Sequence, residues 1–277
     1  MRNNQRRTGQ KPSPQPSSPA PMADMAFAVP TEFVKLPSRG KFYPEEHPLY
    51  NQETVEIKFM TAKDEDILSS QALLEANLAV DRLLESLLVQ DIDPGTLLVG
   101  DRSAILIAAR ISGYGENYDV DHRCPKCLTS LEVNFRLSGV TLNDKCFEED
   151  FMHENGIVYN EDTQTFDLTL PASGVQVGLR LIDGYAEKEA LSYENDNKRE
   201  SLVTSTLAAF LVKVNDDTNP KYVESFIEAM PAKDSKYIRD LYPQMVPTVR
   251  LLHDFQCKAC YHKGELEVPL RAAFFWP

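Results

Sequence analysis

The sequence lacks long apolar segments and an excess of positive charge. No window approaches the roughly 18 consecutive apolar residues of a membrane-spanning helix, and residues 1–22 have no apolar core of a secretion signal. We therefore expect a protein that is made in the cytoplasm and has no membrane partner. Acidic residues outnumber basic ones by 42 to 29, so the net charge is −13. Because binding to phosphate needs a positive surface, we also expect no nucleic-acid partner.

The common motifs of catalysis are missing as well. The sequence has no phosphate-binding P-loop, no Gly-x-Gly-x-x-Gly turn, no His-Glu-x-x-His helix and no Gly-x-Ser-x-Gly elbow. Its five histidines are scattered and form no arrangement of nucleophile and base. The acids Glu187 and Glu189 lie where a helix is expected to begin, which the helix dipole explains. The sequence therefore predicts no enzyme.

Residues 1–30 differ in composition from the rest of the chain. Residues 1–22 contain four basic residues, no acidic ones, and many Pro, Ser and Gln residues. Such a segment cannot bury enough apolar surface to offset its chain entropy, so we expect a disordered basic tail. It is either simply solvated or a docking arm that becomes ordered on a partner.

The first half of the remaining chain, residues 31–140, has the pattern of a strand followed by helices. Residues 54–61 alternate apolar and polar side chains, which is typical of a half-buried strand. Thr61 and Asp64 have the spacing of a capping box before a leucine-rich helical stretch. A second helix is expected from Asp101 toward Gly113.

Residues 171–277 repeat this plan after an acidic connecting segment at 141–170. Alternation returns in residues 174–181, and Asp234 precedes Cys257 by 23 residues, as Asp101 precedes Cys124. We infer an α+β fold made of two pseudo-duplicated strand and helix units. In the second unit, Pro243 and Pro247 are expected to break or kink the last helix.

Four of the five cysteines form two close pairs, and each pair precedes a Leu-Glu-Val strand. Such pairs in a reducing compartment indicate metal ligands rather than disulfides. Tetrahedral zinc takes four soft ligands, and a Cys-x-x-Cys turn offers two thiolates from one tight knuckle. We predict a zinc-ribbon-like site that joins the two halves around one structural zinc ion, with redox or disulfide use as the alternative. The predicted ligands are Cys124, Cys127, Cys257 and Cys260. Four thiolates close the metal shell, which argues against catalytic zinc.

The fifth cysteine, two histidines near the knuckles and the aromatic ending are further candidates for a role. Cys146 has no near partner and is expected to be a free thiol. His122 and His262 flank the knuckles and could replace a cysteine ligand, although outer positions are favoured. The aromatic residues of the "AAFFWP" ending either fold back onto the core or insert into a partner.

Four stretches together resemble the T4-type bacteriophage baseplate hub proteins. They are "LPSRGKFY", "MTAKDEDILS", the two cysteine knuckles and the "FFWP" ending, and the resemblance covers most of residues 33–277. It implies a protein that builds or joins the central hub of a contractile-tail baseplate, with other hub proteins and the tape-measure protein as partners. The expected locations are the host cytoplasm during assembly and the tail baseplate of the virion. The alternative is a zinc-ribbon protein that binds nucleic acid.

Overall fold

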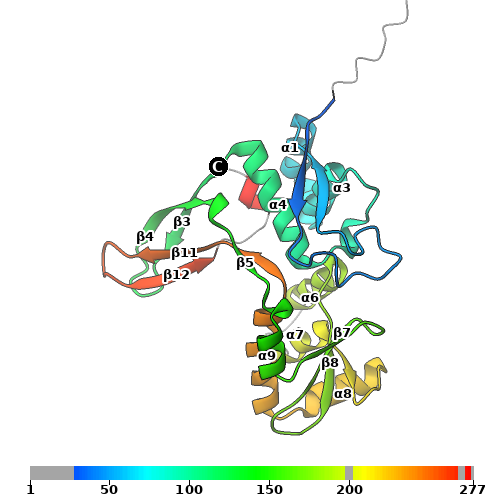
Figure 1. The fold of residues 1–277 in the computed structure, drawn as a ribbon. Helices are drawn as coiled ribbons and strands as arrows, with labels where there is room; N and C mark the ends of the chain where they lie inside the picture. The colour runs from blue at the N-terminus through cyan, green and yellow to red at the C-terminus, as the bar shows by residue number, and fades with distance from the viewer. Residues whose placement is uncertain (1–27, 197–201, 268–271, 276–277) are drawn as a thin grey trace, which may run out of the picture.

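The computed structural model describes residues 28–196, 202–267 and 272–275. Almost all of the predicted tail, and Trp276, lie outside these residues. The described chain has an α+β fold, as the sequence predicted, and Figure 1 shows a body of helices and small sheets with a long two-hairpin arm on one side. No described helix has the length and apolar content needed to span a membrane.

The first part of the body begins with an antiparallel pair of strands and continues with helices. The elements are β1 (Thr31–Lys35), β2 (Thr54–Lys58), α1 (Ala62–Ser69), α2 (Gln71–Glu75), α3 (Ala79–Leu87), η1 (Pro94–Thr96) and α4 (Val99–Tyr114). The predicted capping box is formed, with Thr61 N donating to Asp64 Oδ2 at 2.7 Å. The single leucine-rich helical stretch is instead three short helices, because Ser70 is extended and Asn77 adopts a left-handed φ of 54°.

The second part of the body surrounds a four-stranded antiparallel sheet. Its strands lie in the order β6 (Val158–Asn160), β7 (Thr165–Thr169), β8 (Gln176–Leu179) and β9 (Leu211–Val214). The helices are α6 (Gly184–Asp196), α7 (Leu202–Phe210), α8 (Pro220–Ala229) and α9 (Ala232–Met245). The acidic segment also contains regular elements: β5 (Thr141–Asn143), η3 (Lys145–Phe147) and α5 (Glu149–Glu154).

The expectation that Pro243 and Pro247 break or kink the last helix is wrong for a break at Pro243, and a kink stays a prediction. Pro243 lies inside α9, which continues to Met245, and Pro247 follows the helix. A proline so near the C-terminus removes little hydrogen bonding, and the side chain of Asn143 caps the end of α9. Its Nδ2 donates to the carbonyl of Pro243 at 3.2 Å and to that of Val246 at 2.7 Å. The free carbonyls of the last turn are thereby satisfied.

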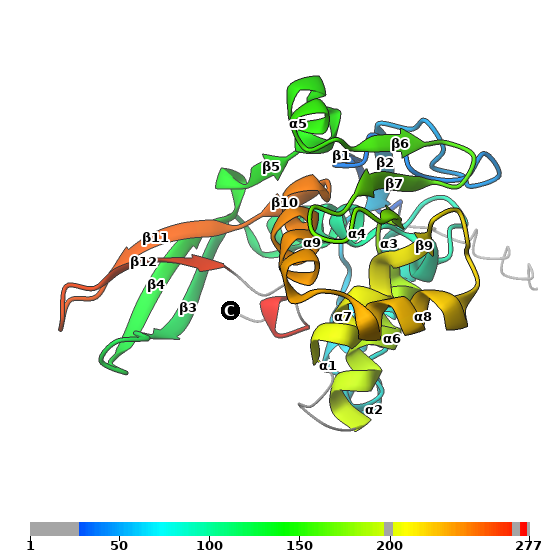
Figure 2. The same ribbon diagram turned by 90° about the horizontal axis from the view of Figure 1, so that it is seen from below.

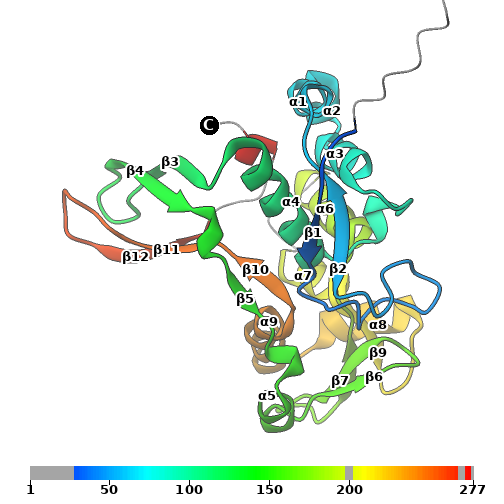
Figure 3. The ribbon, with the colours of Figure 1, turned by 45° about the horizontal axis from the view of Figure 1, so that its top comes forward.

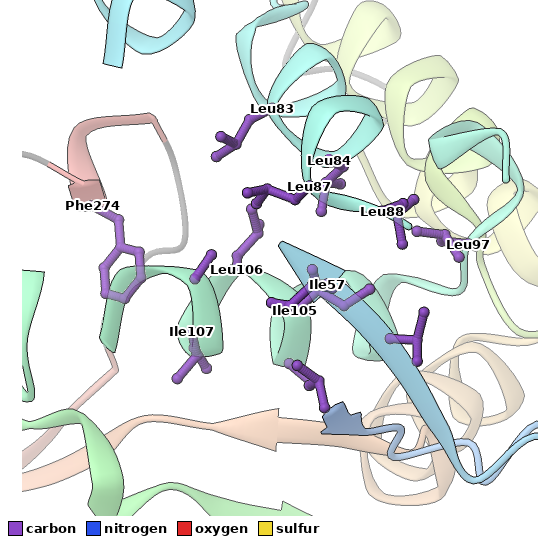
Figure 4. Close-up of a cluster of buried hydrophobic side chains, with 14 of the residues drawn as sticks. Ile57, Leu83, Leu84, Leu87, Leu88, Leu97, Ile105, Leu106, Ile107 and Phe274 are labelled. Carbon is purple, nitrogen blue, oxygen red and sulfur yellow. The ribbon is translucent and has the colours of Figure 1, made fainter. Parts of the chain in front are cut away.

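The apolar side chains form two cores. The first contains residues from 34 to 137 and again from 251 to 275, whereas the second contains residues from 146 to 245. Figure 4 shows the first core, where leucines of α3 face α4 and β2, and Phe274 closes one side. The chain from residue 251 onward therefore contributes to the first core rather than the second, and the sequence-based boundaries at 140 and 171 stay a prediction.

The aromatic residues near the C-terminus fold back onto this first core. Phe274 and Phe275 are buried, with exposed fractions of 1% and 0%. The buried side chain of Arg110 in α4 donates to the carbonyl of Phe274 at 3.3 Å and to that of Gly115 at 3.3 Å. One of the two alternatives left open by the sequence, insertion into a partner, thus does not apply to these two side chains.

A buried carboxylate in α4 holds the turn that follows β1. Asp101 Oδ1 accepts a hydrogen bond from Ser38 N at 3.0 Å, and Oδ2 accepts from Ser38 Oγ at 2.5 Å and from Tyr43 OH at 2.8 Å. Burial raises the pKa of the Asp101 carboxyl, and these donors oppose the rise. The turn has the sequence Leu-Pro-Ser-Arg-Gly at 36–40, part of the "LPSRGKFY" stretch.

The second part of the body also has an aspartate in the first turn of a helix that accepts hydrogen bonds from a turn after a strand. Asp234, the third residue of α9 as Asp101 is of α4, accepts from Ala172 N at 2.7 Å and Ser173 N at 2.9 Å. These donors lie in Leu-Pro-Ala-Ser-Gly at 170–174, directly after β7. Sequence reasoning paired the two aspartates by spacing but missed the repeated Leu-Pro-x-x-Gly turn, which a comparison of the chain with itself would find.

Removing either carboxylate is expected to destabilise the protein. Asp101→Ala leaves three donors without an acceptor, so we expect the free energy of unfolding to fall by about 3 kcal/mol, since one unpaired buried polar group costs roughly 1–3 kcal/mol. Asp234→Ala leaves two donors, and a loss of about 2 kcal/mol is expected. Urea denaturation measures both, and Asp91→Ala on the exposed surface is the control. Losses no larger than that of the control would show that these turns need no such anchor.

Candidate metal centre

The four predicted ligands lie on two hairpins that together form the arm. One hairpin consists of β3 (Asn117–Arg123) and β4 (Ser130–Arg136), and the other of β11 (Leu252–Gln256) and β12 (Lys263–Glu267). Figure 3 shows the hairpins side by side, directed away from the body. At the base of the arm, β5 pairs with β10 (Thr248–Arg250), as Figure 2 shows. Among the described strands, no pairing joins one hairpin to the other.

Each hairpin turns through a cysteine knuckle with the same backbone geometry. In the first, Leu128 N donates to the carbonyl of Cys124 at 2.8 Å, and Tyr261 N donates to that of Cys257 at 2.9 Å in the second. Leu128 and Tyr261 adopt left-handed φ angles of 61° and 56°. This conformation suits glycine and costs a bulky residue roughly 1–2 kcal/mol.

The two knuckles bring the four sulfur atoms together. All four lie within 4.8 Å of one another, with Cys124 Sγ 3.7 Å from Cys260 Sγ and Cys127 Sγ 3.5 Å from Cys257 Sγ. A tetrahedral site with metal–sulfur bonds of about 2.3 Å has sulfur atoms about 3.8 Å apart. The sulfur cluster therefore has the size of a four-thiolate metal site, and it could hold one metal ion.

The thiol groups of Cys127 and Cys260 in the cluster have different pKa values. The hydroxyl and backbone of Thr129 lower the pKa of Cys127 to about 6, and the hydroxyl oxygen lies 3.3 Å from Cys127 Sγ. At Cys260 the backbone of His262 favours the thiolate, but desolvation and the three neighbouring sulfurs raise the pKa to about 12. Four thiols so close together cannot all ionise alone, so a cation that binds here replaces protons.

The two histidines near the knuckles lie beside the cluster and are not among the atoms that gather in it. The ring of His122 contacts Phe255 edge to face at 4.9 Å, and that of His262 lies 6.2 Å from the same phenylalanine. Phe255 is buried and contacts both histidine rings. Cys146 is a free thiol in the second core, where burial raises its pKa to about 12.

Comparison with known proteins identifies a family for the chain. A family model described as T4 bacteriophage base plate protein matches residues 29–276. The chain belongs to this family. The match covers both cores and the whole arm of the baseplate protein, so the resemblance seen in the sequence is confirmed at the level of the family. A search of curated proteins and a search of solved structures gave no match.

Proposed function

We propose that this baseplate protein is a structural or assembly component of the baseplate hub and acts by binding other proteins. Its proposed partners are other hub proteins and the tape-measure protein, first in the host cytoplasm and then in the virion tail. The observation that carries the proposal is the family match, which extends over nearly all the described residues. The proposed role involves no catalysis, in keeping with the missing catalytic motifs.

The proposed cofactor is one structural zinc ion held by the two knuckles. Zinc is favoured because thiolates are soft ligands and the sulfur spacing suits a tetrahedron. Four protein ligands leave no position for a reactive water, so such an ion fixes geometry rather than activating a nucleophile. Since no strand pairing joins the described hairpins, the ion would hold the outer ends of the arm together.

The proposed origin of the fold is an internal duplication, with halves near residues 31–140 and 171–277. It is supported by the two cysteine knuckles, which share backbone geometry. It is also supported by Asp101 and Asp234, each buried in the first turn of a helix and bonded to a Leu-Pro-x-x-Gly turn. In both halves the first two strands are antiparallel neighbours: β1 with β2, and β8 with β9.

Peptide mass spectrometry on purified phage particles, compared with infected-cell lysate, tests the proposed location. We expect peptides of this chain at a few copies per particle, together with cross-links to hub proteins and to the tape-measure protein. Peptides in the lysate but not in particles would indicate a transient assembly factor. Absence of cross-links to any baseplate or tape-measure protein in either sample would contradict the hub role.

A further inference from the structure

The tip of the arm presents two apolar side chains to solvent from equivalent positions. Leu128 and Tyr261 each follow the second cysteine of a knuckle, and their exposed fractions are 74% and 75%. Both have the left-handed backbone that glycine adopts without strain. The chain thus carries large, exposed side chains where folding alone favours glycine, and the sulfur cluster brings the two positions to the same tip. Strained and exposed residues of this kind point to contact with a partner.

The tip also differs in charge from the rest of the protein. Residues 122–131 and 255–264 contain no Asp or Glu but four basic residues, all exposed. They are Arg123, Lys126, Lys258 and Lys263. The remainder of the chain has 42 acidic residues and 25 basic ones. The surface that complements this tip is therefore acidic, and the protein's own body has that character.

One face of the body combines acidic and apolar groups around a cleft of about 360 Å³. Four carboxylates line it, from Asp81, Glu85, Asp91 and Asp93, together with the cations of Arg82 and Lys188. Asp81 pairs with Arg102 and Lys188, Glu85 pairs with Arg82 at 2.7 Å, and Asp93 accepts a hydrogen bond from Tyr185 OH at 2.5 Å. The lining therefore has two more carboxylates than cations, and Asp91 is exposed. Leu78 and Tyr185 also line it and are 39% and 54% exposed. The cleft lies among α3, η1 and α6, and in Figure 1 α3 and α6 lie across the body from the tip of the arm. An arm cannot reach the cleft of its own chain in this arrangement, whereas the arm of a second copy can.

We propose that the arm tip of one copy docks in the acidic cleft of a second copy. Leu128 and Tyr261 are the apolar anchors, and the basic residues of the tip face Asp91 and the excess of carboxylates over cations around the cleft. Tip and cleft are different surfaces, so the contact is directional. Repetition of such a contact forms a closed ring or an open chain, according to the angle between neighbours. This self-association does not depend on the hub role, since it concerns only copies of this chain.

Sedimentation velocity of the zinc-loaded full chain over a concentration series tests the proposal. We expect species larger than the monomer that become less abundant as salt is raised, because screening weakens the charge pairs. The double variant Leu128→Gly and Tyr261→Gly is expected to weaken association at least tenfold. Its zinc content is expected to be unchanged and its melting temperature no lower, since glycine relieves the backbone strain. The matched control is Val158→Ser with Tyr222→Ser, which removes an exposed aliphatic and an exposed aromatic side chain elsewhere and should associate like the wild type.

Mixing two defective copies tests the direction of the contact. The cleft variant Glu85→Lys with Asp91→Lys retains an intact arm, whereas the glycine variant retains an intact cleft. Alone, each is expected to stay monomeric, and an equimolar mixture is expected to form a dimer and nothing larger.

Three results would overturn the proposal. They are a wild-type protein that stays monomeric at every concentration, association unaffected by the glycine variant, and a mixture that does not dimerise. Binding of a DNA or RNA oligonucleotide that the glycine variant or Lys126→Glu abolishes, without self-association, would assign the tip to nucleic acid instead.

Discussion

Replacement of Cys257 by serine is expected to remove almost all binding of the proposed zinc ion. Cys257 is fully buried, and its sulfur lies 3.5 Å from that of Cys127, so the substitution removes one of the four gathered sulfur ligands. A hydroxyl is a poor zinc ligand at neutral pH because metal binding requires a deprotonated donor. Metal analysis of the purified protein measures the content directly. We expect near-complete loss because a structural zinc site depends on all four ligands.

The structural effect of the same change should be concentrated in the arm. The two cores of the body contain none of the four ligands, whereas the described hairpins share no strand pairing. Hydrogen exchange is therefore expected to increase in β3, β4, β11 and β12 far more than in α4 or α9. Cys146→Ser is the matched control, because it removes a cysteine outside the cluster and should leave the zinc content unchanged. If the metal content and the melting temperature of Cys257→Ser were unchanged, the proposal that a zinc ion holds the two hairpins together would be contradicted.

Replacement of Phe275 by alanine should lower the free energy of unfolding by about 3–5 kcal/mol, the usual range for a fully buried phenylalanine. Its side chain is 0% exposed and packs edge to face against Phe274 at 5.6 Å, while Phe274 contacts Tyr118 at 5.1 Å. The substitution leaves a cavity in the first core, of which Phe275 is a member. Denaturation in urea measures the loss, with Phe33→Ala as control because Phe33 is 70% exposed. A loss as small as that of Phe33→Ala would mean that the aromatic ending does not close the core in solution.

The sequence was most informative where the signal is local. Alternation predicted β2 and β8, the spacing of Thr61 and Asp64 predicted the start of α1, and two Cys-x-x-Cys turns predicted four sulfurs in one place. The strands, the capping box and each single cysteine knuckle are encoded within a few residues, whereas the meeting of the two knuckles depends on long-range packing.

The parts that were missed depend on distant residues. β5 is only three residues long and is a strand because β10, far along the chain, pairs with it. The end of α9 survives its proline because Asn143 supplies the cap from that same strand. The divided helix after β2 depends on Asn77, whose left-handed backbone is common for asparagine but is not obligatory. The acidic cleft arises where α3, η1 and α6 meet, and no single segment contains its pattern.

The path of the chain through the two cores determines the order in which they can be completed during synthesis. Residues 146–245 of the second core leave the ribosome before residues 251–275, which the first core needs. The first core can therefore be completed only after the chain of the second core has been made, although domains usually fold in order from the N-terminus. Until the end of the chain has been made, the first core lacks Phe274, whose ring contacts Tyr118 in the folded protein. During that interval the exposed apolar surface of the first unit is a natural target for chaperones, and translation that stops before residue 274 leaves it open.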